Sequence, residues 1–157
     1  MKRLRSLLLC SFAMLSASYA CAGEAAYVEP QLKHAAYGNL NIVVPVSSGD
    51  TRIWQFKMGN IMNALNAAEK FGGKLTIKVV AYSRGVELLK QKDNETAEML
   101  NELRTKGVQF LACNNSLKGM NIDYHALNGV TEADIVPAGF LEIAWLQTQN
   151  YQVDPMN

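Results

Sequence analysis

Short apolar runs alternate along this chain with segments of helical periodicity, and this alternation constrains the fold more than any other feature. Four strands are predicted, at residues 40–46, 75–81, 108–113 and 133–136. Two of these runs are continuously apolar, which is typical of parallel strands buried on both faces. Pro45 lacks an amide donor, so its strand is expected at an edge or to end its ladder nearby. The sequence therefore predicts an α/β fold, a three-layer sandwich with a mainly parallel sheet of about four to five strands between helices.

Between these runs, apolar residues recur at helical spacing. Five of them lie three or four positions apart and predict one face of a long helix. They are Trp54, Met58, Ile61, Leu65 and Ala68. Asp50 or Thr51 can cap the start of this helix, and Gly72 with Gly73 ends it. The last predicted helix, residues 140–149, is apolar over much of its circumference. Such a helix packs on more than one surface, so we expect a subunit interface there.

The N-terminus has the pattern of a secretory signal peptide over residues 1–22. Basic residues precede a short apolar stretch, and Ala20, Cys21 and Ala22 fit the small-residue cleavage pattern. We therefore expect export, most simply to a bacterial periplasm, with an extended lead-in at 23–38 and the folded domain at 39–157. The apolar stretch is too short to span a bilayer, so no stable membrane insertion is expected. Lipidation of Cys21 is the alternative, although Ser18 stands where that signal normally has an aliphatic residue.

Composition excludes several classes of protein. The chain has 157 residues, of which 49% are hydrophobic and 18% charged, and a net charge of +1. That charge, with no segment of interleaved basic and aromatic residues, argues against a nucleic-acid partner. Removal of residues 1–22 takes away three basic residues and two of the three cysteines. The exported chain would be slightly acidic, with Cys113 as its remaining cysteine and no intramolecular disulfide.

Cys113 stands where open parallel sheets place their functional sites. Such sites lie beyond the carboxyl ends of the strands. This rule selects four turns, at residues 47–50, 82–85, 113–116 and 137–139. Ser116 is a candidate start of a short helix, whose free amides favour a thiolate. Arg84 would add positive charge if its turn is adjacent. The alternative is that Cys113 is an inert core residue at a strand end.

The other predicted site residues come from the same turns. The substrate-binding candidates are Ser47, Ser48, Gly49, Asp50, Arg84, Asn114, Asn115 and Ser116. The amides and hydroxyl after Cys113 offer donors to a bound anion or sulfur, and the first turn would shape the pocket.

The chain has no motif for a cofactor or a metal ion. His34 and His125 lack cysteine or acidic partners at ligand spacing. Neither a dinucleotide fingerprint nor a phosphate loop is present, since Ala68 replaces the glycine that Gly72-Gly73-Lys74 would need. A hydrolase pair of Cys113 and His125 is conceivable, but no third residue to orient it is evident. We therefore expect no cofactor and no metal.

An ordered set of segments carries a resemblance to a known family. These segments are 46–50, 61–65, 79–86, 103–108, 110–117, 136–139 and 146–151. Over residues 39–153 the chain resembles the DsrE/DsrF-like family (YchN-like fold), in particular its exported single-domain members. The resemblance implies a homotrimer or homohexamer. In the sulfur-relay members a cysteine carries sulfur as a persulfide to a partner, and that role falls on Cys113. Those members have a basic pair with glycine after the cysteine, whereas this chain has one basic residue there, Lys118.

Three hypotheses follow from these observations. The leading one is a periplasmic sulfur-handling protein, a possible sulfurtransferase-like carrier, with a sulfur donor or acceptor protein as partner. The second is an oligomeric binding or structural protein in which Cys113 is inert and buried. The third is a redox-responsive protein that dimerises through Cys113. The reactivity of the Cys113 thiol in the folded protein separates them.

Overall fold

The structure, a computed structural model, describes residues 26–92 and 94–154. The predicted signal peptide at 1–22, with Cys10 and Cys21, lies outside the described residues. Residues 26–37 form no helix or strand. The described helices and strands all lie in one compact unit of the chain, Leu32–Asn157. No helix of the described ranges has both the length and the apolar character needed to cross a membrane.

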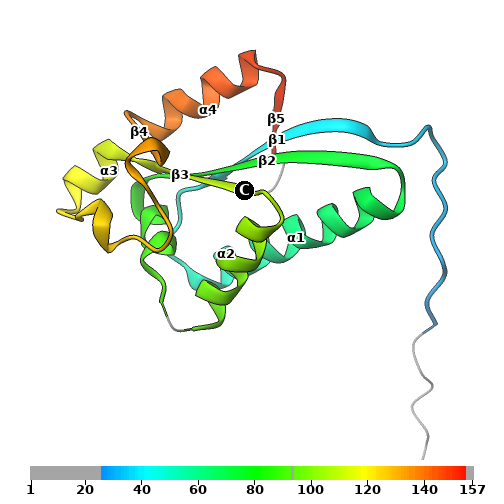
Figure 1. The fold of residues 1–157 in the computed structure, drawn as a ribbon, viewed down its shortest axis with the longest axis horizontal. Helices are drawn as coiled ribbons and strands as arrows, with labels where there is room; N and C mark the ends of the chain where they lie inside the picture. Colours follow the sequence, from blue (N-terminus) through cyan, green and yellow to red (C-terminus); the bar gives the residue numbers. More distant parts are fainter. Residues whose placement is uncertain (1–25, 93, 155–157) are drawn as a thin grey trace, which may run out of the picture. The chain divides into compact units, whose positions relative to one another are not determined.

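Five parallel strands form a single sheet in the order β4-β3-β2-β1-β5 (Figure 1). The strands are β1 (Gly38–Val46), β2 (Gly73–Ala81), β3 (Gln109–Cys113), β4 (Ile135–Val136) and β5 (Tyr151–Val153). The α-helices are α1 (Thr51–Lys70), α2 (Glu95–Thr105), α3 (Asn114–Gly119) and α4 (Gly139–Thr148). The 3₁₀ helices are η1 (Ser83–Lys90), η2 (Tyr124–Ala126) and η3 (Glu132–Asp134). The predicted three-layer α/β fold is confirmed.

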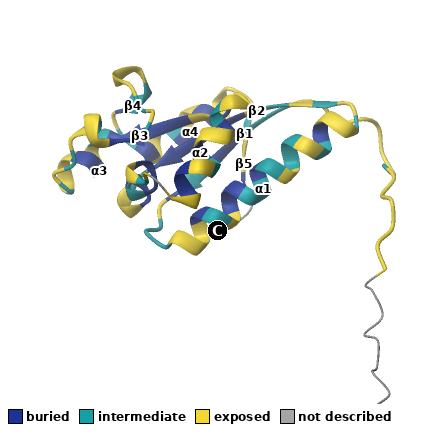
Figure 2. Cartoon of the chain, turned by 60° about the horizontal axis from the view of Figure 1, so that its bottom comes forward, coloured by how far each residue is buried: buried dark blue, intermediate teal, exposed yellow. Residues whose placement is uncertain are grey.

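The helices cover the two faces of the sheet unequally. On one face, α1, α2 and η1 pack on residues such as Val44, Val79 and Phe110 through a large core that includes Trp54 and Leu100. Of the helices that the structure describes, α4 is the one that packs on the other face of the sheet (Figure 1). This smaller core consists of Val43, Val80, Leu111, Val136, Ile143 and Leu146. Figure 2 shows buried strands between helices whose outer sides are exposed.

Capping side chains begin α1 and α2, and the cap of α1 is one that the sequence predicts. The Asp50 carboxylate accepts a hydrogen bond from the Arg52 amide (2.9 Å) at the start of α1. Asn94 accepts one from the Ala97 amide (2.9 Å) at the start of α2. Each cap satisfies an amide that the first helical turn leaves without a partner.

Pro45 lies in an interior strand, which corrects one of the two placements expected for it. β1 pairs with β2 along its whole length and with β5 from Asn41 to Val43. The Val43 carbonyl accepts a hydrogen bond from Asp154, so alternate residues of β1, including Pro45, direct their backbone groups toward the β5 side. The pairing of β1 with β5 ends at Val43, so the ladder ends near Pro45, as the other expectation states. No hydrogen bond between these two strands therefore needs the amide hydrogen that proline lacks.

Near the C-terminus, one predicted boundary is wrong and one strand was not predicted. The strand expected at 133–136 is shorter, because Glu132–Asp134 forms the 3₁₀ helix η3. The Thr131 amide and hydroxyl both donate to the Asp134 carboxylate (2.9 and 2.8 Å), which closes this turn. The chain after α4 also returns to the sheet as β5, which no helical or strand pattern in the sequence indicates.

A buried ion pair fastens the end of β5 to the long helix. The Lys57 ammonium of α1 lies 2.8 Å from the Asp154 carboxylate, and the two side chains are 8% and 5% exposed. Asp154 directly follows β5, and its amide donates to Val43 (2.9 Å). The pair therefore connects an edge strand to the helix layer of the large core.

Breaking this pair is expected to destabilise the fold strongly. Lys57→Met leaves the Asp154 carboxylate buried without its ammonium, and such a loss costs about 3–5 kcal/mol in other proteins. Urea unfolding followed by circular dichroism measures the change. Arg52→Met is the control, because the Arg52–Asp50 pair is exposed and its midpoint should stay close to that of the unmodified protein. Equal midpoints for the two variants would contradict this role of the buried pair.

Candidate functional site

The turns that follow β1, β2 and β3 are held together by hydrogen bonds at the carboxyl edge of the sheet. The Tyr82 amide donates to the Val46 carbonyl (2.9 Å), and the Gly85 amide donates to the Ser47 carbonyl (3.1 Å). The Ser83 amide donates to the Ser116 hydroxyl oxygen (2.7 Å). These hydrogen bonds bring three of the predicted turns together. The fourth turn, at 137–139, joins them because Gly139 lies against Tyr82 and Cys113.

Cys113 lies at the centre of this cluster. It is the last residue of β3 and the N-cap of α3, and its exposed fraction is 4%. The predicted helix start at Ser116 is corrected, since α3 begins at Asn114. Cys113 therefore lies directly before the free amides of the first turn of α3, although its side chain accepts no capping hydrogen bond. Among the described residues Cys113 is the one cysteine, and it forms no disulfide.

The polar groups around Cys113 set the pKa of its thiol. Hydrogen bonding from the Ser116 hydroxyl, and from the backbone amides of Gly139, Ser116 and Asn115, lowers that pKa. Burial raises the pKa of the Cys113 thiol and is the largest single influence, because a low-dielectric environment disfavours the charged thiolate. Together the four hydrogen bonds outweigh burial, so the pKa of Cys113 lies below its usual value. The Cys113 thiol therefore forms the nucleophilic thiolate more readily than an ordinary cysteine does.

Ser83 determines how the Ser116 hydroxyl is oriented. Its amide donates to the Ser116 oxygen, so one acceptor position of that hydroxyl is already occupied. The hydroxyl hydrogen is then available to donate to the Cys113 sulfur. Ser83 adopts a left-handed backbone conformation with φ +48°, which is uncommon for a residue other than glycine. The turn after β2 therefore positions a donor on α3.

Gly139 is a glycine because the site leaves no space for a side chain. A Cβ at this position would lie 2.7 Å from the Tyr82 Cβ and 3.3 Å from the Cys113 Cβ. The close packing brings the first amide of α4 within hydrogen-bonding reach of the sulfur. Tyr82 forms the opposite wall of this contact.

Arg84 does not supply the positive charge expected beside Cys113. Its side chain is 73% exposed, and its guanidinium pairs with the Glu87 carboxylate at 3.3 Å. The guanidinium also lies against the backbone of Gly49. The donors around the sulfur are backbone amides and a hydroxyl, and these replace the predicted side-chain cation.

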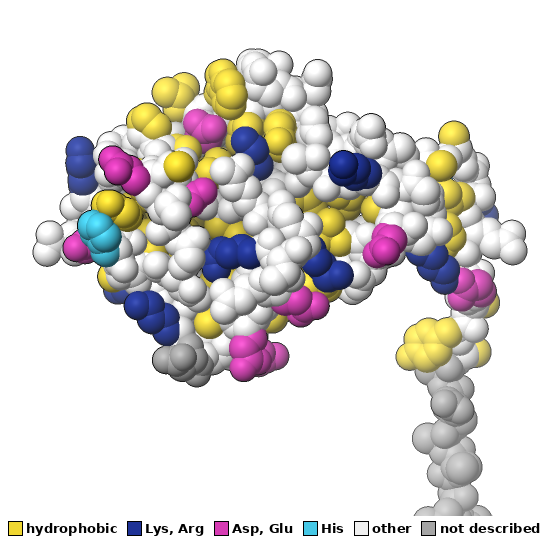
Figure 3. Space-filling view, viewed as in Figure 1, with side chains coloured by type: hydrophobic (Ala, Val, Ile, Leu, Met, Phe, Trp, Pro, Cys, Tyr) yellow, Lys and Arg dark blue, Asp and Glu magenta, His cyan; other side chains and the backbone are white. Residues whose placement is uncertain are grey.

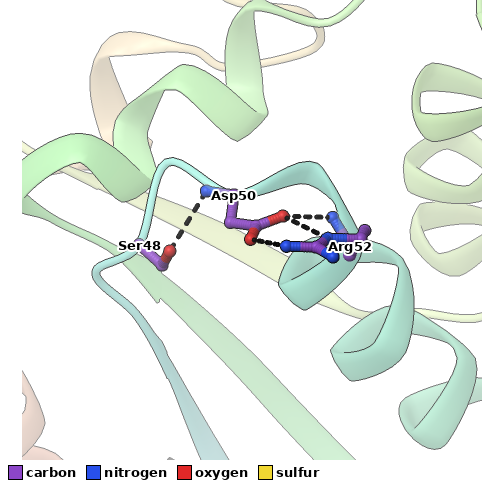
Figure 4. Close-up of polar contacts among 3 residues, drawn as sticks. All are labelled: Ser48, Asp50 and Arg52. Atoms are coloured by element: carbon purple, nitrogen blue, oxygen red, sulfur yellow. Dashed lines mark hydrogen bonds and ion pairs between the residues drawn. The ribbon is translucent and has the colours of Figure 1, made fainter.

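The turn at 47–50 serves mainly to begin α1. The Ser48 hydroxyl accepts from the Asp50 amide (3.1 Å), and Asp50 accepts from Arg52 (Figure 4). Hydrogen bonds from the Arg52 side chain and amide lower the pKa of Asp50. The side chains of Ser48 and Asp50 are therefore occupied in the capping turn, and Ser47 contributes a backbone carbonyl.

Asn114 and Asn115 have different surroundings although they are neighbours. Asn115 is exposed and contributes its amide to the Cys113 sulfur. Asn114 lines a separate cavity of about 510 Å³, together with Lys118 and Tyr124. In the part of the chain that the structure describes, no three His, Cys, Asp or Glu residues gather in a group able to hold a metal ion.

Comparison with known proteins identifies the family. The model of the DsrE/DsrF-like family matches residues 55–153, which include Cys113 and Gly139. The chain belongs to the DsrE/DsrF-like family. This family is generally linked to sulfur relay. Among solved structures, the chain is similar to MTH1491 from Methanobacterium thermoautotrophicum, a protein of unknown function. The two are 29% identical with a TM-score of 0.63, and the match covers 73% of this chain and 97% of that one. No curated protein matches the chain.

Three residues of this DsrE/DsrF-like site were not predicted from the sequence. They are Ser83, Tyr82 and Gly139. The sequence pattern could have indicated Gly139 as a site residue, because the turn at 137–139 is one of the four turns predicted at the same sheet edge as Cys113. Ser83 and Tyr82 lie in the turn from which Arg84 was selected. Ser83 acts through its hydrogen bond to Ser116, and Tyr82 through its close packing on Gly139. These contacts join separate turns and cannot be read from residue type.

Removing the Ser116 hydroxyl is expected to raise the pKa of the Cys113 thiol. Ser116→Ala deletes the hydroxyl whose hydrogen bonding lowers the pKa of the thiol, so that pKa should rise. The rate of iodoacetamide alkylation as a function of pH measures this, with Cys113→Ser as the blank. The midpoint should move to higher pH in Ser116→Ala and stay unchanged in Ser116→Thr. A midpoint unchanged in Ser116→Ala would contradict the hydrogen bond.

Adding a methyl group at Gly139 is expected to displace the start of α4. Gly139→Ala overpacks the contact with Tyr82, which should cost about 1–3 kcal/mol of stability. The displaced amide should also leave Cys113 less reactive at neutral pH. Gly119→Ala is the control, since nothing lies within 4 Å of a Cβ there. Thermal unfolding and alkylation rates that are the same for both variants would disprove the steric argument.

Proposed function

We propose that this DsrE/DsrF-like protein handles sulfur in the periplasm, with Cys113 as the nucleophile that carries a persulfide. The observation that carries the proposal is the position of the buried Cys113, which ends β3 at the carboxyl edge of a parallel sheet and directly precedes α3. Hydrogen bonding from Ser116 and Gly139, which lowers the pKa of its thiol, supports the same role. The family link to sulfur relay supports the same chemistry.

The proposed reaction is a transfer of sulfane sulfur between thiols. The Cys113 thiolate attacks the outer sulfur of a donor persulfide, R–S–SH. A new S–S bond forms on Cys113, and the S–S bond of the donor breaks. The donor leaves with that electron pair as the thiolate R–S⁻. In the second step an acceptor thiolate attacks the outer sulfur on Cys113, takes it, and releases the Cys113 thiolate. No electrons are gained or lost overall.

The donors around Cys113 suit both steps. In the first step they increase the fraction of thiolate, which is the nucleophile. In the second step Cys113 is the leaving group, and a thiol with a lower pKa leaves faster. Backbone amides at the N-terminal ends of α3 and α4 stabilise the negative charge of the thiolate without rearrangement.

The burial of Cys113 limits the kind of sulfur donor. With 4% of the residue exposed, a flat protein surface does not reach the sulfur. A small persulfide, or an extended segment that bears one, fits this access better. The proposed periplasmic location rests on the signal-peptide pattern at 1–22. In an oxidising compartment a lone cysteine keeps its thiol available, because no second cysteine can pair with it within the chain.

Sulfur loading tests the proposal directly. After incubation with glutathione persulfide, the protein should gain the mass of one sulfur atom at Cys113, and Cys113→Ser should gain none there. Peptide mass spectrometry locates the added sulfur. Transfer to a second thiol should then return the protein to its original mass. Failure of the unmodified protein to gain sulfur, under conditions that load a low-pKa reference thiol, would refute the proposal.

The same burial favours a second candidate, a binding or structural protein with an inert Cys113. Free cysteines at strand ends often act as small core hydrophobes. This candidate predicts that the Cys113 thiol resists alkylation until the protein unfolds. Rapid alkylation of the native protein would exclude it.

A further inference from the structure

Two apolar cavities adjoin each other between α1 and the side of the sheet that β1 and β5 form. One has a volume of about 230 Å³ and the other about 160 Å³, and Ile42 and Ala64 line both. The first cavity begins at Tyr37, and the second ends at Val153 and Asp154. We name the two cavities together the α1 channel.

Small side chains on α1 leave this space open. Ala64 and Ala67 line the channel where it passes the first half of β1, whereas larger residues such as Trp54 fill the core nearer the start of the helix. α1 already touches the start of β2 here, since a Cβ at Gly73 would lie 3.2 Å from the Ala68 Cβ. The helix therefore cannot close the channel by moving toward the sheet.

The lining of the channel suits an aliphatic chain better than it suits water. Its polar side chains are Tyr37 at one end and Asn60, Gln152 and Asp154 at the other, and the rest are apolar. Water finds few hydrogen-bond partners in such a space, whereas an apolar ligand is favoured there because its surface leaves water. Together the two volumes reach the lower end of the range, about 300–1,000 Å³, that small-molecule sites occupy.

We propose that the α1 channel binds the aliphatic chain of a small amphiphile with an uncharged head group, such as a fatty alcohol. None of the described residues that line the channel is cationic, and Asp154 is the one that carries a charge. Its carboxylate pairs with Lys57 at 2.8 Å and would repel the carboxylate of a fatty acid. Gln152 is exposed at the same end, where its amide can bind a hydroxyl group.

The extent of the channel indicates the length of the chain that it binds. The channel follows β1 from Leu40 to Val44, and a strand of that length spans about 13 Å. An extended hydrocarbon with C–C bonds of about 1.5 Å advances about 1.3 Å per carbon. A chain of about ten carbons therefore fills the channel.

The channel and Cys113 lie on opposite faces of the sheet. Ile42 and Val44 belong to the core under α1, whereas Leu111, two residues before Cys113, belongs to the core under α4. Alternate residues of a strand face the same side, so the Cys113 side chain is on the α4 side. The inference therefore goes beyond the proposed sulfur chemistry and does not rest on it.

Displacement of a fluorescent dye tests the site. Nile red, which fluoresces in apolar surroundings, should bind the purified protein and be displaced by decanol. The affinity should rise about fourfold for each methylene from hexanol to decanol, because each added methylene is buried. Decanoate should bind at least tenfold more weakly than decanol. Equal binding of decanoate and decanol, or no displacement by decanol, would overturn the proposal.

Ala64→Leu is the decisive variant, because it fills the position that the two cavities share. It should weaken decanol binding more than tenfold. Asn66→Leu is the matched control, since it adds the same side chain to α1 at an exposed position that lines neither cavity. The apolar outer side of α4, at the top of Figure 3, lies on the other face of the sheet. Dye bound there should be equal in the two variants.

A second variant keeps the result interpretable. A circular dichroism spectrum and a Cys113 alkylation profile like those of the unmodified protein would show that Ala64→Leu is folded. If it does not fold, Ala67→Leu narrows only the cavity that begins at Tyr37. That variant should weaken decanol binding tenfold or more and change hexanol binding less than twofold, because the shorter chain fits in the other cavity. Decanol affinity equal to that of the unmodified protein in a folded leucine variant would refute the site.

Discussion

All five strands run in the same direction, and the candidate site depends on this shared direction. Each of β1, β2, β3 and β4 delivers the start of the next helical segment to one edge of the sheet. Backbone hydrogen bonds between neighbouring turns, such as Tyr82 to Val46, then hold that edge together. Because these contacts involve the main chain, the position of the sulfur does not rely on long side chains. A parallel sheet thus concentrates helix starts, and their amides, around the residue that ends its β3 strand.

The charge of a Cys113 thiolate is balanced by dipoles rather than by a cation. Burial to 4% exposure opposes ionisation, and three amides with one hydroxyl more than compensate for it. Arg84 is in contact with solvent and with Glu87, where screening weakens its influence. Amides and a hydroxyl, rather than a cationic side chain, lower the pKa of the Cys113 thiol. Such dipoles suit a thiolate, whose single negative charge stays on the sulfur atom.

The sequence predicts the architecture better than the details of the site. Continuous apolar runs and the cap at Asp50 are local signals, and the strands and the long helix that they predict are present. β5 has only three residues, and its pairing with β1, rather than its own composition, makes it a strand. The apolar run at 108–113 correctly predicts that Cys113 ends a strand. The contributions of Ser83 and Gly139 come from contacts with distant segments, which no local pattern records.

α4 links the sulfur to the surface of the molecule. Its first amide lowers the pKa of Cys113, its inner side packs on the sheet, and its outer side carries the exposed Phe140, Leu141 and Trp145. A Cβ at Gly139 would lie 2.7 Å from the Tyr82 Cβ and 3.3 Å from the Cys113 Cβ, so only glycine lets the start of α4 approach both residues this closely. The packing of Ile143 and Leu146 on the sheet then fixes the rest of the helix. The amide that lowers the pKa of Cys113 is therefore held in place by the same core that supports the sheet.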